Sequence, residues 1–145
     1  MNIIETVRAI LESFPKIAEV CNSVHIDFTD PEPSSFGLSS TGDELIREDI
    51  IGNQRRQHSF MLYTTYSSMN DYERLHNSSA LLELSVWLSD QTGAEVETVS
   101  GSEVCTGTLE KLTAANGMLY SVPQENSIEG VQYQLQIIAE YTVRR

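Results

Sequence analysis

The sequence predicts a single α+β domain over residues 1–145, in which a largely antiparallel sheet carries its helices packed on one face. Three observations predict this class. A length of 145 residues is typical of one domain. Residues 131–143 alternate strictly between apolar and polar side chains, which indicates a strand with one buried face. Two segments, residues 2–14 and about 67–91, repeat apolar residues at helical spacing.

The N-terminal helix is predicted over residues 2–14 and ends before Pro15, because the residue preceding a proline avoids the helical region. Asn2 can cap this helix, and Glu5 stands three positions later, as in a capping box. A strand over residues 24–28, a turn at 30–33 and a short strand over 35–38 follow. The Ser-, Thr- and Gly-containing residues 39–43 are predicted to form a loop.

Residues 44–66 are predicted to form a hairpin with a tight turn at Gly52-Asn53. The second arm has apolar groups on both faces, which is typical of a central strand covered on both sides. A helix is expected from about residue 67 to residue 91, with a possible break at 77–79, and Trp87 is expected to anchor it to the sheet.

The polar, Gly- and Ser-rich residues 92–107 are predicted to form a long loop. Strands are expected over 108–114 and 118–122, joined by a turn at Asn116-Gly117, and a further turn is expected over 123–130. The last strand is the clearest element. Its apolar residues hold seven consecutive odd positions and predict one face on the core: Val131, Tyr133, Leu135, Ile137, Ala139, Tyr141 and Val143.

Nine basic and 21 acidic residues give a net charge of −12, so the chain is a poor candidate for binding a nucleic-acid backbone. No basic and apolar secretory signal and no apolar stretch of roughly 20 residues is present, so we expect no membrane span and a cytoplasmic site of synthesis. Cys21 and Cys105 match no disulfide framework and are expected to be reduced thiols.

The sequence contains no recognisable catalytic, metal-binding or phosphate-binding motif. His25, His58 and His76 share no short spacing, so we expect no metal site. Neither a GxSxG nucleophile turn nor a glycine-rich phosphate loop is present. We therefore expect no catalytic residues, no cofactor and no enzymatic activity.

The basic residues cluster at Arg55-Arg56, with Arg47 on the facing arm of the predicted hairpin. One interpretation makes these arginines cross-strand partners of Glu48 and Asp49 on an exposed hairpin. A second interpretation is that the hairpin docks on an acidic neighbouring subunit. The third interpretation, direct contact with nucleic acid, is the least favoured. The candidate subunit-contact residues are Arg47, Ile50, Ile51, Arg55 and Arg56.

Three stretches resemble the small tail-terminator-like "minor capsid" proteins of tailed phages and prophages of Gram-positive bacteria. The first is MNIIETVRAILESFP at the start of the chain. The second is RRQHSFMLYTTY at 55–66 with the helix that follows it and ends in VWL at 86–88. The third is NGMLY at 116–120 followed by VQYQLQ at 131–136. The resemblance covers most of the chain, but residues 92–107 have no counterpart in it.

The resemblance implies a structural virion protein that caps the head-proximal end of a tail tube as a ring, typically of six subunits. Such a ring stops tube growth and presents a surface to head-completion proteins, with the tube and sheath proteins as further partners. DNA would pass through the lumen without specific binding, assembly would take place in the host cytoplasm, and no catalytic residue would be required.

Three alternatives stay open beside this interpretation. The chain could be another head–tail connector or tail-completion subunit, a cytosolic binding module without catalysis, or, least favoured, an enzyme. The hairpin over 47–56 and the residues 92–107 are the elements that we expect to make subunit contacts.

Overall fold

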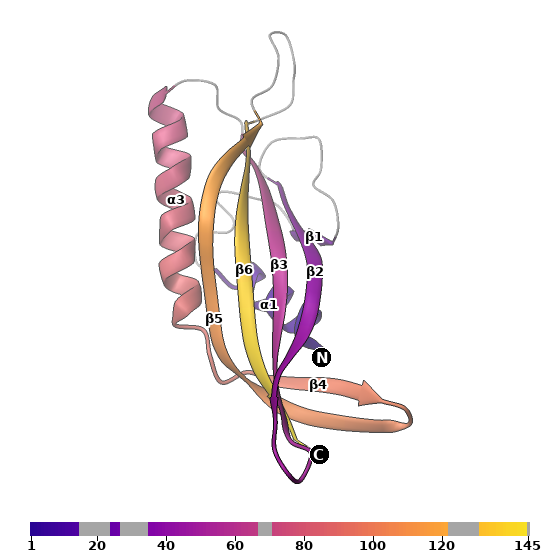
Figure 1. Cartoon of the computed structure of the whole chain (residues 1–145). Helices are drawn as coiled ribbons and strands as arrows, with labels where there is room; N and C mark the ends of the chain where they lie inside the picture. Colours follow the sequence, from indigo (N-terminus) through magenta and orange to yellow (C-terminus); the bar gives the residue numbers. More distant parts are fainter. Residues whose placement is uncertain (15–23, 27–34, 67–70, 122–130, 145) are drawn as a thin grey trace.

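The computed structural model describes residues 1–14, 24–26, 35–66, 71–121 and 131–144. In this part of the chain two helices and six strands follow one another (Figure 1). They are α1 (Ile3–Glu12), β1 (Val24–Ile26), β2 (Ser35–Glu48), β3 (Gln54–Tyr66), α3 (Asp71–Ser89), β4 (Glu95–Ser100), β5 (Glu103–Ser121) and β6 (Val131–Val143).

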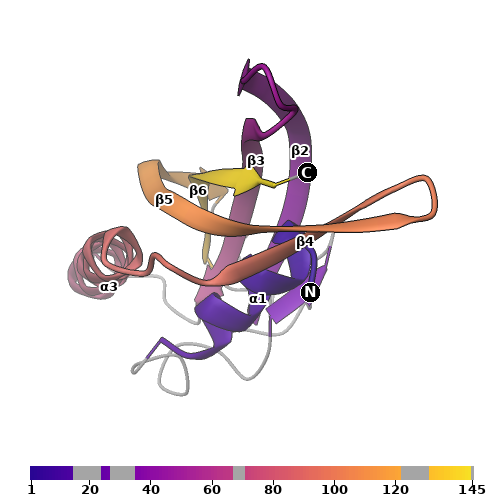
Figure 2. The same cartoon turned by 90° about the horizontal axis from the view of Figure 1, so that it is seen from below.

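The strands form one sheet in the order β1-β2-β3-β6-β5-β4. All neighbouring strands are antiparallel except β1 and β2, which are parallel. Seen from below, the sheet is curved, α1 lies against it and α3 runs beside β5 (Figure 2). The predicted α+β class with a largely antiparallel sheet is confirmed.

From Leu135 to Val143 the odd positions of the last strand lie in the core, as predicted, and the side chains of Val131 and Tyr133 lie outside the described part of the structure. Leu135 and Ile137 are buried and stand opposite the buried Leu62 and Phe60 of β3. Each fully buried side chain of this kind contributes about 1.5–3 kcal/mol relative to an exposed one. Among the side chains that the structure describes, the other buried apolar residues of the sheet are Leu38, Val96, Cys105, Leu109, Leu112, Ala139, Tyr141 and Val143.

Both described helices contribute to this same core. The α1 stripe buries Ile3, Val7 and Leu11, and its first turn is capped by Asn2, whose side-chain oxygen accepts a hydrogen bond from the Glu5 backbone N–H at 2.9 Å. Among the described side chains of α3, Leu81, Leu84 and Leu88 are buried. The two helices therefore bury their apolar stripes together with one face of the sheet.

Trp87 packs against the core that the sheet residues form, and it has a further contact that the sequence did not predict. It is half-buried, and its ring meets Phe14 edge-on with the centroids 5.1 Å apart. Such an edge-to-face pair contributes about 0.5–1.5 kcal/mol beyond the buried area. Trp87 thus joins α3 to the end of α1 as well as to the core.

Several sequence-based element predictions are wrong in a common way, because a strand continues where small polar residues predict a break. The predicted loop 39–43 lies within β2, which passes through it with a bulge between Ser40 and Gly42. The predicted turn at Asn116-Gly117 lies within β5, where the register shifts between Ala115 and Met118. A bulge lets a strand absorb an extra residue without ending.

The predicted long loop over 92–107 is also wrong, since most of it forms the hairpin of β4 and β5. Gly101 adopts a φ of 64° at the turn, a conformation that glycine reaches without strain. The possible break at 77–79 does not occur, because α3 is continuous. Strand β3 is central, as predicted, although its Met61 and Tyr63 are only half-buried. The predicted turns at 30–33 and 123–130 lie outside the described residues.

Candidate functional site

The β2–β3 tip, defined here as residues 45–53, extends beyond the core at one end of the sheet (Figure 1). Its turn is a five-residue loop closed by Asp49, whose carboxylate oxygen Oδ1 accepts hydrogen bonds from the backbone N–H groups of Ile51 at 3.1 Å and Asn53 at 2.9 Å. This loop replaces the predicted two-residue turn. Ile50 and Ile51 therefore lie in the loop, where they are 105% and 75% exposed.

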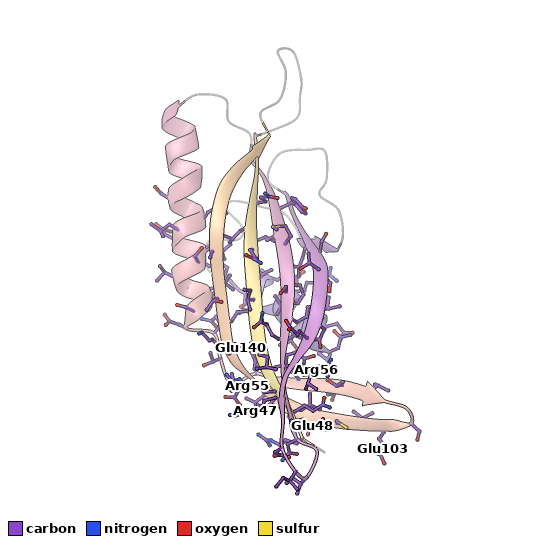
Figure 3. The ribbon with its side chains drawn as sticks, in the orientation of Figure 1. Arg47, Glu48, Arg55, Arg56, Glu103 and Glu140 are labelled. Atoms are coloured by element: carbon purple, nitrogen blue, oxygen red, sulfur yellow. The ribbon has the colours of Figure 1, made fainter. Side chains whose placement is uncertain are left out.

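The arginines of this hairpin do not pair with Glu48 and Asp49, so that interpretation is wrong. Figure 3 shows the positions of their side chains. Arg55 donates from Nη2 to Glu140 Oε2 at 2.9 Å, across to β6. Arg56 is turned toward β2 and bonds to Asp43, described below. Arg47 is exposed and forms no ion pair with the described residues.

A second projection, the β4–β5 arm, consists of residues 95–108 and extends sideways from the same end of the molecule (Figures 1 and 2). Val99 and Val104 stand opposite one another in its register and are 70% and 62% exposed. Nearer the body, Val96 and Cys105 are buried, and Cys105 is a free thiol. Cys21 lies outside the described residues.

The two projections together expose apolar side chains that the core does not use. On the β2–β3 tip these include Leu45, Ile46, Ile50 and Ile51, and on the β4–β5 arm they are Val99 and Val104. Grouped apolar side chains with polar neighbours are typical of interaction surfaces. Because the tip and the arm project in different directions, they are two separate surfaces (Figure 2).

At the base of the β2–β3 tip lies a polar cluster, the Asp43 network, formed by Asp43, Ser40, Arg56, His58 and Tyr141. In a regular strand, residues three apart point to opposite faces. The bulge between Ser40 and Gly42 adds one residue to β2, so Ser40 and Asp43 both reach the buried face. Asp43 stands opposite His58, and Arg56 stands opposite Tyr141.

Asp43 is the centre of this network. Its Oδ2 accepts from the Tyr141 hydroxyl at 2.6 Å and lies 2.9 Å from His58 Nδ1, while its Oδ1 accepts from Arg56 Nε at 2.6 Å. The other ring nitrogen of His58, Nε2, lies 2.5 Å from Ser40 Oγ. His58 and Tyr141 are buried, and Ser40 is exposed.

The charge state of Asp43 determines the direction of these bonds. Burial alone would raise the pKa of Asp43, but the hydrogen bonds from Tyr141, His58 and Arg56 and the guanidinium charge of Arg56 outweigh burial and lower the pKa. An ionised carboxylate only accepts hydrogen bonds. The tautomer of His58 that fits this carboxylate carries its proton on Nδ1 and accepts at Nε2 from the Ser40 hydroxyl.

The same network shifts two other groups. Burial and the neighbouring Asp43 carboxylate raise the pKa of Tyr141, which keeps its hydroxyl protonated as a donor. The hydrogen bond to Asp43 raises the pKa of Arg56. Each buried polar group of the network thus has a partner, as the interior of a stable fold requires.

Two cavities border these features. One of about 430 Å³ is walled by the start of α1, by β4 and by His58, Asp43 and Tyr141. The other, of about 380 Å³, lies under the β2–β3 tip and is lined mainly by polar groups, including Arg47, Arg55, Glu110 and Arg144. Among the described residues no group of three His, Cys, Asp or Glu side chains is placed to hold a metal ion.

The Asp43 network was missed by sequence reasoning because its members share no sequence motif. The one usable signal is the alternation of β3, which puts Arg56, His58 and Phe60 on one face. Both ring nitrogens of His58 have partners within the fold, Asp43 and Ser40. The side chains of His25 and His76 lie outside the described part of the structure.

No protein-family model and no curated protein sequence matches this chain. Within the described residues, no helix has the length and apolar content needed to cross a membrane.

Proposed function

We propose that the protein is a structural subunit of a phage or phage-tail-like particle that caps the end of the tail tube as a ring. In that role it stops tube growth and offers the surface to which the head-completion protein joins. The observation that carries the proposal is the pair of projections, the β2–β3 tip and the β4–β5 arm, which expose apolar side chains on two separate surfaces.

A ring requires each subunit to use two different surfaces, one toward each neighbour. Such a heterologous contact closes when the rotation between subunits allows it. The tip exposes Ile50 and Ile51, and the arm exposes Val99 and Val104. These apolar side chains favour contact between the tip of one subunit and the arm of the next, because the contact removes them from water. A hexameric ring is the form that the family resemblance implies.

The charge of the chain suits a passage for DNA. A net charge of −12 repels phosphates, so DNA can move through a ring of these subunits without being held. The remaining partners in this proposal are the tail tube, a sheath protein where the tail contracts, and the connector above. A different connector position in the same particle is the runner-up, and it predicts the same surfaces.

Of the candidate contact residues, Arg47, Ile50 and Ile51 are the best placed for a neighbour. Arg55 and Arg56 already have partners within the chain, Glu140 and Asp43. Replacing both with glutamate is therefore expected to disturb the fold as well as any contact with a neighbour.

Deletion of the gene in cells that produce the particle tests the function. We expect tubes of irregular excess length that lack heads, because nothing stops their growth. Complementation with the Ile50→Asp, Ile51→Asp double variant should fail, and complementation with Leu82→Asp should succeed, since Leu82 is exposed on α3 away from both projections. Tubes of normal length in the deletion strain, measured by electron microscopy, would contradict the proposal.

A further inference from the structure

The Asp43 network contains an arrangement that a ring subunit does not need. Ser40 Oγ, His58 Nε2, His58 Nδ1 and Asp43 Oδ2 form one continuous chain of hydrogen bonds, with lengths of 2.5 Å and 2.9 Å. This is the order in which a serine, a general base and an orienting carboxylate stand in serine hydrolases. We propose that Ser40 is a nucleophile for acyl transfer and that the protein hydrolyses small, uncharged carboxylic esters.

The network favours the histidine tautomer that this chemistry requires. Asp43 is held ionised by Tyr141 and Arg56, and its carboxylate accepts a proton on His58 Nδ1. In that tautomer His58 Nε2 faces the Ser40 hydroxyl as an acceptor. A positioned base of this kind typically accelerates proton transfer by about 10²–10⁴-fold.

The exposure of His58 and of Ser40 also suits their proposed roles. His58 is 7% exposed, so its ring is held in one orientation by the surrounding fold. Ser40 is exposed, so an ester can reach its hydroxyl from solvent. The bulge that brings Ser40 and Asp43 to one face leaves Thr41 without a partner in the register of β3. Bulges are enriched beside active sites because they redirect side chains in this way.

The proposed reaction proceeds in two balanced steps. Ser40 Oγ attacks the ester carbonyl carbon and passes its proton to His58 Nε2; the bond from that carbon to the alcohol oxygen breaks, and His58 returns the proton to the departing alcohol. Water then attacks the acyl-Ser40 ester, giving one proton through His58 to Ser40 Oγ and releasing a carboxylic acid. No oxidant, metal or other co-reactant is required.

The surroundings define the substrate class. The cavity beside the network includes His58 and Asp43 but not Ser40, and it is also lined by Glu5, Glu97 and the Met1 ammonium that pairs with Glu97. Acidic groups still outnumber the basic one in this lining, and the whole chain is strongly acidic. Anionic substrates such as phosphate esters are therefore repelled. A neutral ester with a small acyl group meets no such barrier at an exposed serine.

A fluorophosphonate probe, which reacts with activated serines, tests the proposal on the full chain. We expect one probe per molecule by intact-mass spectrometry, with peptide sequencing placing it on Ser40. The same protein should release a burst of nitrophenol from p-nitrophenyl acetate. Ser40→Ala should abolish both signals, and Ser39→Ala, the neighbouring serine in the strand, should leave both unchanged.

His58→Gln should lower the labelling rate of Ser40 by about 100-fold or more, because the base is lost. His58→Gln removes a buried side chain, so its thermal unfolding is measured together with its labelling rate. Ser40→Ala lies at an exposed position and tests the proposal independently of whether the histidine variant folds. Absence of labelling in the folded wild-type chain would overturn the proposal. Labelling that persists in Ser40→Ala, or that is lost equally in Ser39→Ala, would overturn it too.

Discussion

Removal of the Tyr141 hydroxyl is the sharpest test of the Asp43 network. In Tyr141→Phe the ring stays in the core and only the donor to Asp43 Oδ2, at 2.6 Å, is lost. A hydrogen bond to a charged group contributes about 1.5–3 kcal/mol. The Asp43 side chain is 25% exposed, so water replaces part of this bond, and we expect a loss near the lower limit, about 1.5 kcal/mol.

The expected effect is measurable by urea unfolding and by calorimetry. For a domain of this size, about 1.5 kcal/mol corresponds to a decrease of about 3–6 °C in Tm. The effect should also depend on pH. The lowered pKa of Asp43 contributes stability above its unfolded value of 3.8, and this stability is lost as the pH falls through the lower folded value. The difference between wild type and variant should therefore decrease in acid.

The alkaline side gives an independent check. Because the pKa of Tyr141 is raised in the fold, the wild type loses stability as the pH rises above about 10, where the unfolded tyrosine ionises. Phenylalanine cannot ionise, so the variant does not share this loss. The stability difference should thus be largest near neutrality and smaller at both extremes.

A double-mutant cycle with Asp43→Asn supplies the control. Because asparagine carries no charge, the Tyr141→Phe change should cost less in that background, with a coupling energy of about 1 kcal/mol. A coupling below about 0.3 kcal/mol, or a Tyr141→Phe effect that is the same from acid to alkali, would refute the account of the network.

Three further substitutions test the fold. Ile137→Asp should cost several kcal/mol and abolish cooperative melting, because it buries a charge on the core face of β6; a melting curve close to the wild type would mean that this face is assigned wrongly. Gly107→Ala should lower Tm strongly, because a Cβ there would lie 1.5 Å from the Thr142 carbonyl oxygen, and an unchanged Tm would refute that close approach. Arg55→Glu should cost about 1 kcal/mol or less in urea unfolding, since the pair with Glu140 is partly exposed; a much larger loss would show that the pair is more strongly coupled than its exposure indicates.

The elements with a strict period were predictable from the sequence. The alternation in β6 and the apolar stripe of α1 each report a single buried face, and a local pattern is sufficient to identify such a face. The β4–β5 arm was not predictable in the same way. Most of its side chains are exposed on both faces, so burial imposes little alternation on the sequence, and its glycines and serines resemble those of a loop.

The Asp43 network could not be predicted because it depends on register. A two-residue turn at Gly52-Asn53 would place His58 opposite Arg47. The five-residue loop and the bulge between Leu45 and Arg47 place it opposite Asp43 instead. A change of register alters every cross-strand neighbour while leaving the hydrophobic pattern almost intact, so composition and periodicity carry no information about it.

The β4–β5 arm has a consequence for how copies of the chain avoid uncontrolled association. Strand β4 stands last in the sheet order, and an edge strand is a template on which a further strand can be added. The backbone N–H of Glu97 is already bonded to the Met1 carbonyl oxygen at 2.9 Å, and the Glu97 carboxylate pairs with the Met1 ammonium at 3.0 Å. The carboxylate of Glu95 is exposed on the same strand. Met1 thus occupies part of this edge, and stacking identical edges would bring the Glu95 charges together, so polymerisation into fibres through β4 is disfavoured.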